Sequence, residues 1–140
     1  MRKFIISLSA LAALISGAAY ANNVDISNSN QSVGPLKITY VTAQKNNNEP
    51  GQYSDPQVVL LKAGQTLNIN TPQNGFQYSG IVVTQINFTT STGKEMSQSF
   101  DEKTFGQAYS CSYSTSNENQ SGQINLELSE HRLTCQHANV

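Results

Sequence analysis

Apolar residues recur at every second position over most of this chain, and this spacing constrains its fold more than any other feature. The spacing is that of a β-strand with one buried face. No stretch of ten or more residues has the helical period. The sequence therefore predicts an all-β protein. The clearest alternating series are Leu36, Ile38 and Tyr40, then Tyr109, Cys111 and Tyr113, and finally Ile124, Leu126 and Leu128.

Turn-forming residues separate the apolar runs at fairly regular intervals. They include Pro50-Gly51, Asn74-Gly75 and Ser121-Gly122. About eight short strands follow from this spacing. A single antiparallel β-sandwich, immunoglobulin-like or jelly-roll-like, is the predicted architecture, and a barrel is the alternative.

One predicted strand, over residues 81–90, has apolar side chains on both faces. Ile81 and Val83 lie on one face, whereas Val82, Ile86 and Phe88 lie on the other. The pattern predicts either a more central strand or a change of phase near residues 84–85, of the kind that a β-bulge produces.

The N-terminal segment is typical of an export signal. Arg2 and Lys3 precede an apolar run that extends to Ile15, and Ala19-Tyr20-Ala21 is a small-x-small cleavage site. We therefore expect a cleaved signal peptide over residues 1–21 and a bacterial protein that is secreted or periplasmic. Residues 22–33 are mostly polar and predict an extended lead-in, or an edge strand at best. The sandwich domain is expected over residues 34–136, with a tail over 137–140.

Export gives meaning to the two cysteines. A pair of cysteines in an oxidising compartment predicts a disulfide between Cys111 and Cys135, and closing a loop of about 25 residues stabilises a fold by roughly 3 kcal/mol. A metal site is the alternative, because His131 and His137 flank Cys135. No metal and no cofactor are predicted.

The disulfide also bears on topology. Residues 106–135 predict a three-stranded meander in which the two cysteines flank the middle strand. They would then lie about 10 Å apart, which exceeds the roughly 4.4–6.8 Å that a disulfide spans. We therefore expect the last strand to leave the meander, and the bond to tie down the C-terminus.

Polarity in this chain comes from amides and hydroxyls, because charged residues make up only 12% of it. Removal of Arg2 and Lys3 changes the formal net charge from −1 to −3. Nucleic acid is therefore not expected as a partner. No second apolar run is long enough to span a bilayer, so no membrane span is expected in the mature protein.

The predicted loops carry the candidate binding residues. If each strand reverses direction, residues 44–57, 71–79, 101–106 and 129–130 meet at one end, and residues 63–64, 91–95 and 116–121 meet at the other. The first end has the longer loops, and long loops on a rigid β scaffold commonly bind ligands. Its candidate binding residues are aromatic or acidic: Tyr53, Asp55, Phe76, Tyr78, Asp101 and Phe105.

Three functional hypotheses follow. The first is a non-catalytic binding protein, of effector, inhibitor or adhesion type, that recognises a protein or a glycan through these loops; a monomer is favoured. The second is a structural subunit that assembles by strand pairing, with residues 22–33 as an arm that completes a neighbour's sheet. The third, a small hydrolase, requires Asp101 or Glu102 to face another acid or His131 across a pocket.

Overall fold

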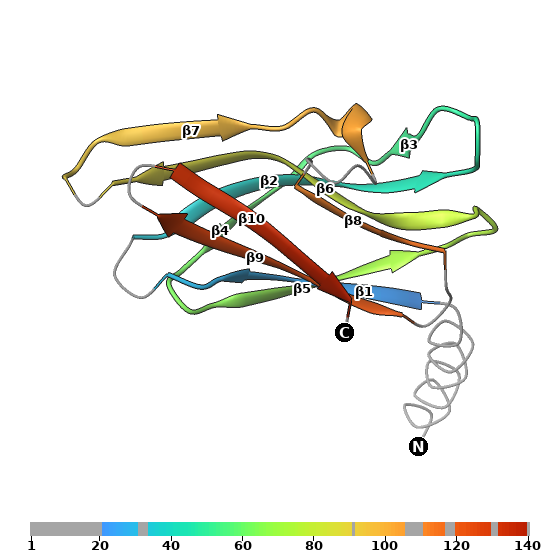
Figure 1. Cartoon of the computed structure of the whole chain (residues 1–140), viewed down its shortest axis with the longest axis horizontal. Coiled ribbons are helices and arrows are strands. Elements are labelled where there is room, and N and C mark those ends of the chain that lie inside the picture. Colours follow the sequence, from blue (N-terminus) through green and yellow to red (C-terminus); the bar gives the residue numbers. More distant parts are fainter. Residues whose placement is uncertain are drawn as a thin grey trace, which may run out of the picture.

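The fold is all-β, as the alternation predicts. The computed structural model describes residues 21–30, 34–90, 92–105, 111–116, 120–129 and 132–139. In this part of the chain ten strands form two sheets, and the one helical element is a short 3-10 turn, η1 (Glu102–Thr104). The two sheets face each other across a shared apolar core (Figure 1).

The first sheet has four described strands, and its centre is the N-terminal strand. β1 pairs in antiparallel orientation with β5 and in parallel orientation with β9, and β10 completes the sheet beside β9. The prediction of a wholly antiparallel arrangement is therefore wrong at one strand pair. The strands are β1 (Ala21–Asn28), β5 (Thr66–Pro72), β9 (Ser121–Ser129) and β10 (Arg132–Asn139).

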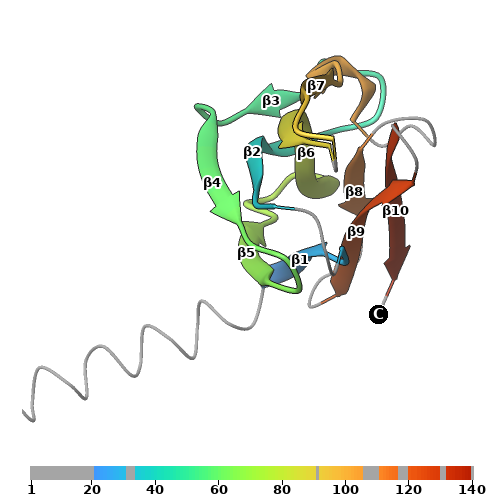
Figure 2. The ribbon, with the colours of Figure 1, turned by 90° about the vertical axis from the view of Figure 1, so that its left-hand side faces the viewer.

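The second sheet has six described strands, built around the long β2–β6 pair. On one side of β2 lie β3 and β4, and on the far side of β6 lie β7 and β8. One of the two sheets is curled into a half-barrel, and Figure 2 shows the two layers end-on. The strands are β2 (Leu36–Lys45), β3 (Gln52–Tyr53), β4 (Gln57–Leu61), β6 (Tyr78–Thr89), β7 (Glu95–Ser99) and β8 (Ser112–Thr115).

Alternate residues of both sheets fill the core between them. Fully buried side chains include Ile26 of β1, Ile38 of β2, Ile86 of β6 and Ile124 of β9. The double-sided strand is confirmed as central, since β6 pairs with β2, β7 and β8. The change of phase is confirmed too, because the β2–β6 register shifts by one residue at Thr84.

The interpretation of residues 22–33 as a lead-in, or an edge strand at best, is wrong for β1. This strand has paired neighbours on both sides, and its interior positions are buried although several are polar. Asn22 and Asn28 are 0% and 1% exposed, with Val24 and Ile26 between them. The polar residues misled the prediction because their amides are satisfied by hydrogen bonds inside the fold.

Two such amides form a network at the end of β1. The Asn28 Nδ2 donates to the carbonyl oxygen of Leu61 at 3.0 Å, and its Oδ1 accepts from the Asn30 backbone N at 3.1 Å and side-chain Nδ2 at 2.7 Å. The Asn30 Oδ1 in turn accepts from the Leu128 N at 2.7 Å. The network therefore joins β1 to β9 in its own sheet and to β4 in the opposite sheet.

The predicted disulfide is present, but it forms by a different route. Cys111 lies beside β6, where its carbonyl oxygen accepts from the Val83 N at 2.8 Å, and Cys135 lies in β10. Their Cα atoms are 5.6 Å apart. The prediction that the last strand leaves the meander is wrong, because β10 stays paired with β9, and it is β8 that belongs to the opposite sheet. The bond therefore ties the C-terminal strand to the facing sheet.

The C-terminal strand extends further than predicted. The predicted tail over residues 137–140 is wrong up to Asn139, which still belongs to β10.

The Tyr113 ring of β8 lies directly on Gly122 of β9, and its hydroxyl donates to the Ser121 carbonyl oxygen at 3.3 Å. A Cβ at position 122 would lie 2.2 Å from the ring's Cζ, so only glycine admits this contact between the sheets.

The prediction that every strand reverses direction fails between β7 and β8. Both strands are antiparallel to β6, so they run the same way. The connections that follow β8 therefore lie at the ends opposite to those predicted. The start of the 116–121 connection lies beside the 71–79 loop, where the Ser116 carbonyl oxygen accepts from the Gln73 Nε2 at 3.2 Å. Ser129 and Arg132, the paired ends of β9 and β10, lie at the opposite end of the sheet.

Candidate functional site

A small second core supports the end of the molecule that carries the two longest loops. Val41 and Ala43 of β2 and Val82 of β6 point away from the main core, yet all three are buried. Phe105, which follows η1 and is 5% exposed, completes this cluster, and Tyr53 and Tyr78 pack against it. Because Phe105 is buried, its role is to hold the end together rather than to contact a ligand.

Hydrogen bonds join the two long loops into one surface. The Gln77 N donates to the Asn46 Oδ1 at 2.9 Å, and the Asn47 N donates to the Gln77 Oε1 at 3.1 Å. The Gln44 Nε2 also donates to the Pro72 carbonyl oxygen at 2.7 Å. Residues 44–57 and 71–79 therefore lie at one end, as predicted. We call this surface, with its half-buried Tyr53, Phe76 and Tyr78, the aromatic loop end.

A hollow of about 240 Å³ opens on the aromatic loop end. It lies where β2 and β3 approach β5 from the opposite sheet. Its lining residues contain amides, hydroxyls, one aromatic ring and a proline, and none of them is ionisable at neutral pH. They include Gln44, Gln52, Tyr53, Ser54, Pro72 and Asn74.

The Tyr53 phenol borders this hollow and stays protonated well into the alkaline range. Burial raises its pKa above the ordinary value, and the nearby carboxylates of Glu102 and Asp101 raise the pKa further. Gly51 makes room for the ring, because a Cβ at position 51 would lie 2.5 Å from the Tyr53 Oη. Tyr53 can therefore offer both a ring edge and a hydroxyl to a ligand.

The structure brings four of the six predicted binding residues together. Tyr53, Tyr78 and Phe105 share one cluster, and Asp101 is close enough to Tyr53 to influence its pKa. The other two predicted residues are set apart from this cluster. Phe76 is half-buried at the turn between β5 and β6, and Asp55 is exposed between β3 and β4 and does not line the hollow.

Asp101 has a local structural role that the sequence did not reveal. Its carboxylate accepts from the Lys103 N at 2.9 Å and so caps η1. Cys111 and Cys135 are consumed by the disulfide, and no group of three His, Cys, Asp or Glu residues in the described segments is arranged to hold a metal ion. His131, which the metal and hydrolase hypotheses invoked, lies outside the described residues.

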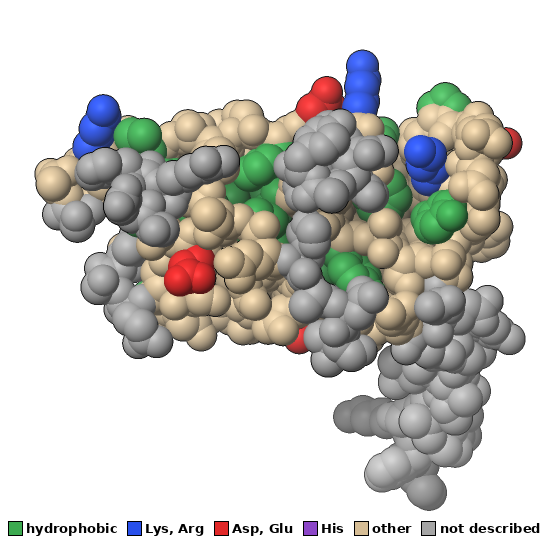
Figure 3. All heavy atoms as spheres, viewed as in Figure 1, with side chains coloured by type: hydrophobic (Ala, Val, Ile, Leu, Met, Phe, Trp, Pro, Cys, Tyr) green, Lys and Arg blue, Asp and Glu red, His purple; other side chains and the backbone are tan. Residues whose placement is uncertain are grey.

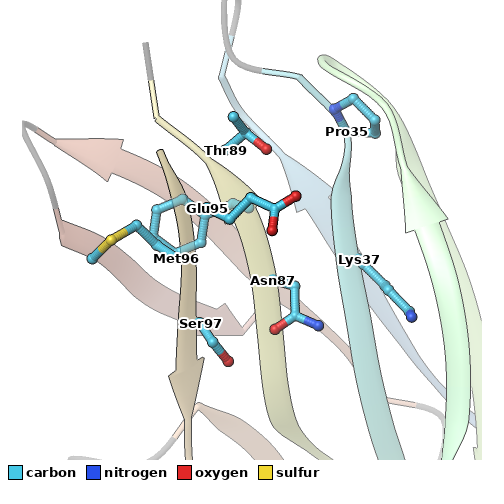
Figure 4. A pocket seen from close by; sticks show the side chains of 8 residues that line it. Pro35, Lys37, Asn87, Thr89, Glu95, Met96 and Ser97 are labelled. Carbon is cyan, nitrogen blue, oxygen red and sulfur yellow. The ribbon is translucent and has the colours of Figure 1, made fainter. Parts of the chain in front are cut away.

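A larger, shallower hollow of about 520 Å³ lies on the outer face of the six-stranded sheet, and the sequence did not indicate it. Its polar lining comes from outward positions of β2, β6 and β7, mainly Lys37, Asn87, Glu95 and Ser97. Figure 4 shows Glu95 and Asn87 between these strands and Met96 pointing away to the other side. The register aligns Lys37, Asn87 and Ser97 in one row. Such a row cannot be found without knowing which strands are neighbours.

Uncharged polar side chains dominate the visible surface. Figure 3 shows scattered charged side chains among a majority of uncharged polar and backbone atoms. Uncharged side chains also pair between strands: the Ser27 and Thr66 hydroxyls lie 2.9 Å apart across β1 and β5. The visible face thus offers mainly uncharged hydrogen-bonding groups.

Comparisons with protein-family models, with curated proteins and with solved structures give no match for this chain. The compartment is indicated instead by the chemistry of the fold. The disulfide points to an oxidising environment outside the cytoplasm. Within the described residues, no helix is long and apolar enough to cross a membrane.

Proposed function

We propose that this chain is an exported, non-catalytic bacterial protein that binds a protein or a glycan through the aromatic loop end. Export rests on the predicted signal peptide and on the disulfide, and the final location is the periplasm or the external medium. The two facing sheets support the sandwich reading over a closed barrel. The immunoglobulin-like or jelly-roll-like subclass stays a prediction.

One observation carries the proposal: the reciprocal hydrogen bonds between Asn46, Asn47 and Gln77 turn two long loops into one fixed surface. A loop surface that is already ordered loses less conformational entropy when it binds. The second core under Tyr53 and Tyr78 holds the aromatic side chains in the same way. Such preorganisation is what a binding surface on a β scaffold requires.

Of the two ligand classes, the hollow favours a glycan. Its lining offers amide and hydroxyl groups from Gln44, Gln52, Ser54 and Asn74, which can exchange hydrogen bonds with sugar hydroxyls. The Tyr53 ring supplies an apolar surface against which a sugar ring can pack. Because the lining has no ionised side chain, a neutral sugar can enter the hollow without removing water from a charged group of the protein.

A glycan array followed by calorimetry of the best ligand tests this proposal. Gln52→Ala and Asn74→Ala remove exposed amides from the hollow, and each should weaken binding by about tenfold, the effect of losing roughly 1.4 kcal/mol. Asn70→Ala removes an exposed amide from β5 outside the hollow and should leave binding unchanged. Equal binding by all three variants would place the ligand elsewhere, and capture of a protein from envelope or host-cell fractions instead of a glycan would favour the other ligand class.

The two alternative functions receive less support from the fold. β1 is paired on both sides within its own chain, so it is not a free arm that could complete a neighbour's sheet. For a hydrolase, Asp101 would have to face a second acid or a base across a pocket. Its carboxylate instead caps η1 beside Tyr53, and neither hollow is lined by Asp101 or Glu102.

A further inference from the structure

The strand β4 forms an unpaired and apolar edge of the six-stranded sheet. It pairs with β2 on one side, and no described strand pairs with its other side. Val58 and Leu60 of this strand are 59% and 62% exposed, and they are the exposed large apolar side chains of the described residues. Figure 2 shows β4 as the outermost strand on the left of the folded body.

The direction of the β4 backbone groups follows from its neighbour. The Ser54 N donates to the Thr42 carbonyl oxygen, so Thr42 of β2 points its backbone toward the β3–β4 side. The N–H and C=O groups of successive strand residues alternate in direction. Residues 36, 38 and 40 of β2 therefore point toward residues 61, 59 and 57 of β4, their partners in the register. It follows that Val58 and Leu60 direct their N–H and C=O groups outward, away from β2.

From this geometry we infer that β4 docks against β4 of a second copy of this chain. The two strands run antiparallel about a two-fold axis at Val59, so that residue 58 of each copy faces residue 60 of the other. Residues 58 and 60 are the ones whose backbone groups point outward, so each of the two facing pairs forms two hydrogen bonds. The same register places Val58 against Leu60 of the partner on the outer face.

The composition of β4 favours a second copy as the occupant. Residues 57–61 read QVVLL and contain no ionisable side chain, so self-pairing brings no like charges together. Edge strands of soluble proteins are usually protected by charged residues, prolines or bulges. Here Pro56 and Lys62 flank the strand instead, and the two-fold register sets each Lys62 opposite a proline rather than another lysine.

Two other edges of the described sheets, β5 and β7, lack this self-complementarity. β5, the edge of the four-stranded sheet beside β1, exposes Thr66, Asn68 and Asn70. β7 exposes Glu95, Ser97 and Ser99. These outward positions are polar, so pairing them would bury side chains that are already solvated. Of these three edges β4 is therefore the one suited to pairing of copies, and such pairing revises the monomer expected from the sequence.

Sedimentation velocity of the disulfide-bonded protein, from micromolar to millimolar concentration, tests the inference. Two five-residue strands bury far less than the ~1,600 Å² of a standard stable interface, so the dimer should be weak and should depend on concentration. Leu60→Lys should raise the dissociation constant at least about tenfold, equivalent to roughly 1.4 kcal/mol. The matched control is Asn70→Lys, which adds the same charge to the free edge of β5 and should leave dimerisation unchanged.

A mixing experiment tests the register. Val58→Lys and Leu60→Glu should each impair self-association, but an equimolar mixture should recover it because the new lysine faces the new glutamate. A mixture of Leu60→Lys and Leu60→Glu lacks that facing pair and should recover less. Circular dichroism confirms that each variant is folded, as expected for residues this exposed. A wild-type protein that stays monomeric at millimolar concentration, a dimer indifferent to Leu60→Lys, or a Val58→Lys and Leu60→Glu mixture without recovery would each overturn the inference.

Discussion

Replacing Asn28 by alanine should destabilise the protein strongly, although this residue belongs to a mostly polar segment that the sequence predicts to be an extended lead-in. The side chain is 1% exposed and takes part in three hydrogen bonds, one to the Leu61 carbonyl oxygen and two from Asn30. Each intramolecular hydrogen bond contributes about 1 kcal/mol, and buried groups that lose their partner add a desolvation cost. Asn28→Ala should therefore lower the free energy of unfolding by roughly 3 kcal/mol.

Urea unfolding followed by far-UV circular dichroism measures this loss, since the chain has no tryptophan for fluorescence. With a slope of roughly 1.5 kcal/mol/M, the unfolding midpoint should fall by about 2 M. The matched control is Asn68→Ala, because Asn68 is also a strand asparagine with one side-chain hydrogen bond, to Asp25 at 2.6 Å, but is exposed. Because Asn68 is exposed, Asn68→Ala should change the free energy of unfolding by less than about 0.5 kcal/mol.

The network also predicts non-additivity. Asn30→Ala removes the bond from the Asn30 Nδ2 to the Asn28 Oδ1, which Asn28→Ala also removes. The double variant should therefore lose less stability than the sum of the two single losses, by at least about 0.5 kcal/mol. If Asn28→Ala is no more destabilising than Asn68→Ala, or if the two effects simply add, the buried amide network does not hold β1 in its sheet. The reasoning about the N-terminal strand would then be refuted.

Three further predictions concern the contacts between the sheets and the loop end. Joint replacement of Cys111 and Cys135 by serine should cost about 3.5 kcal/mol in the chain-entropy model for a sequence separation of 24, and an unchanged urea midpoint would contradict a stabilising bond. Gly122→Ala should cost more than 1 kcal/mol, on the order of an overpacked core, because the added methyl meets the Tyr113 ring; Tyr113→Ala in the same chain should make Gly122→Ala nearly neutral. Because burial and nearby carboxylates raise the pKa of Tyr53 in the folded state, the unfolded chain loses its phenolic proton first, so stability should be intact below about pH 10 and fall as pH rises beyond it. Burial also raises the pKa of Tyr113, so ultraviolet titration at the tyrosinate band should show two late-titrating groups, of which one disappears in Tyr53→Phe; an unchanged late amplitude in that variant would contradict the shift at Tyr53.

Local alternation was sufficient to predict the strands of the core. A side chain that points inward on a strand must be apolar or satisfied, so Leu36, Ile38, Ile124 and Leu126 indicate their faces without knowledge of their neighbours. The β-bulge at Thr84 could be predicted for the same reason, since a phase change is visible within one strand. The disulfide followed from two cysteines and an export signal.

Polar interior positions could not be recognised in this way. Asn22 and Asn28 occupy inward positions of β1, but an asparagine in the sequence gives no indication that partners such as Ser79 or Leu61 will satisfy it. Those partners lie 57 and 33 residues away along the chain. The central place of β1, between β9 and β5, was hidden for that reason.

The candidate site likewise has features that the local sequence indicates and features that only the strand order decides. The sequence alone indicated which loops are long and aromatic, because composition and turn residues are local properties. The contact of these loops through Asn46 and Gln77, the hollow beside Tyr53 and the outward backbone of β4 were decided by strand order. Strand order depends on hydrogen bonds between segments distant in the chain, and no periodicity within a single segment can encode which neighbour it will meet.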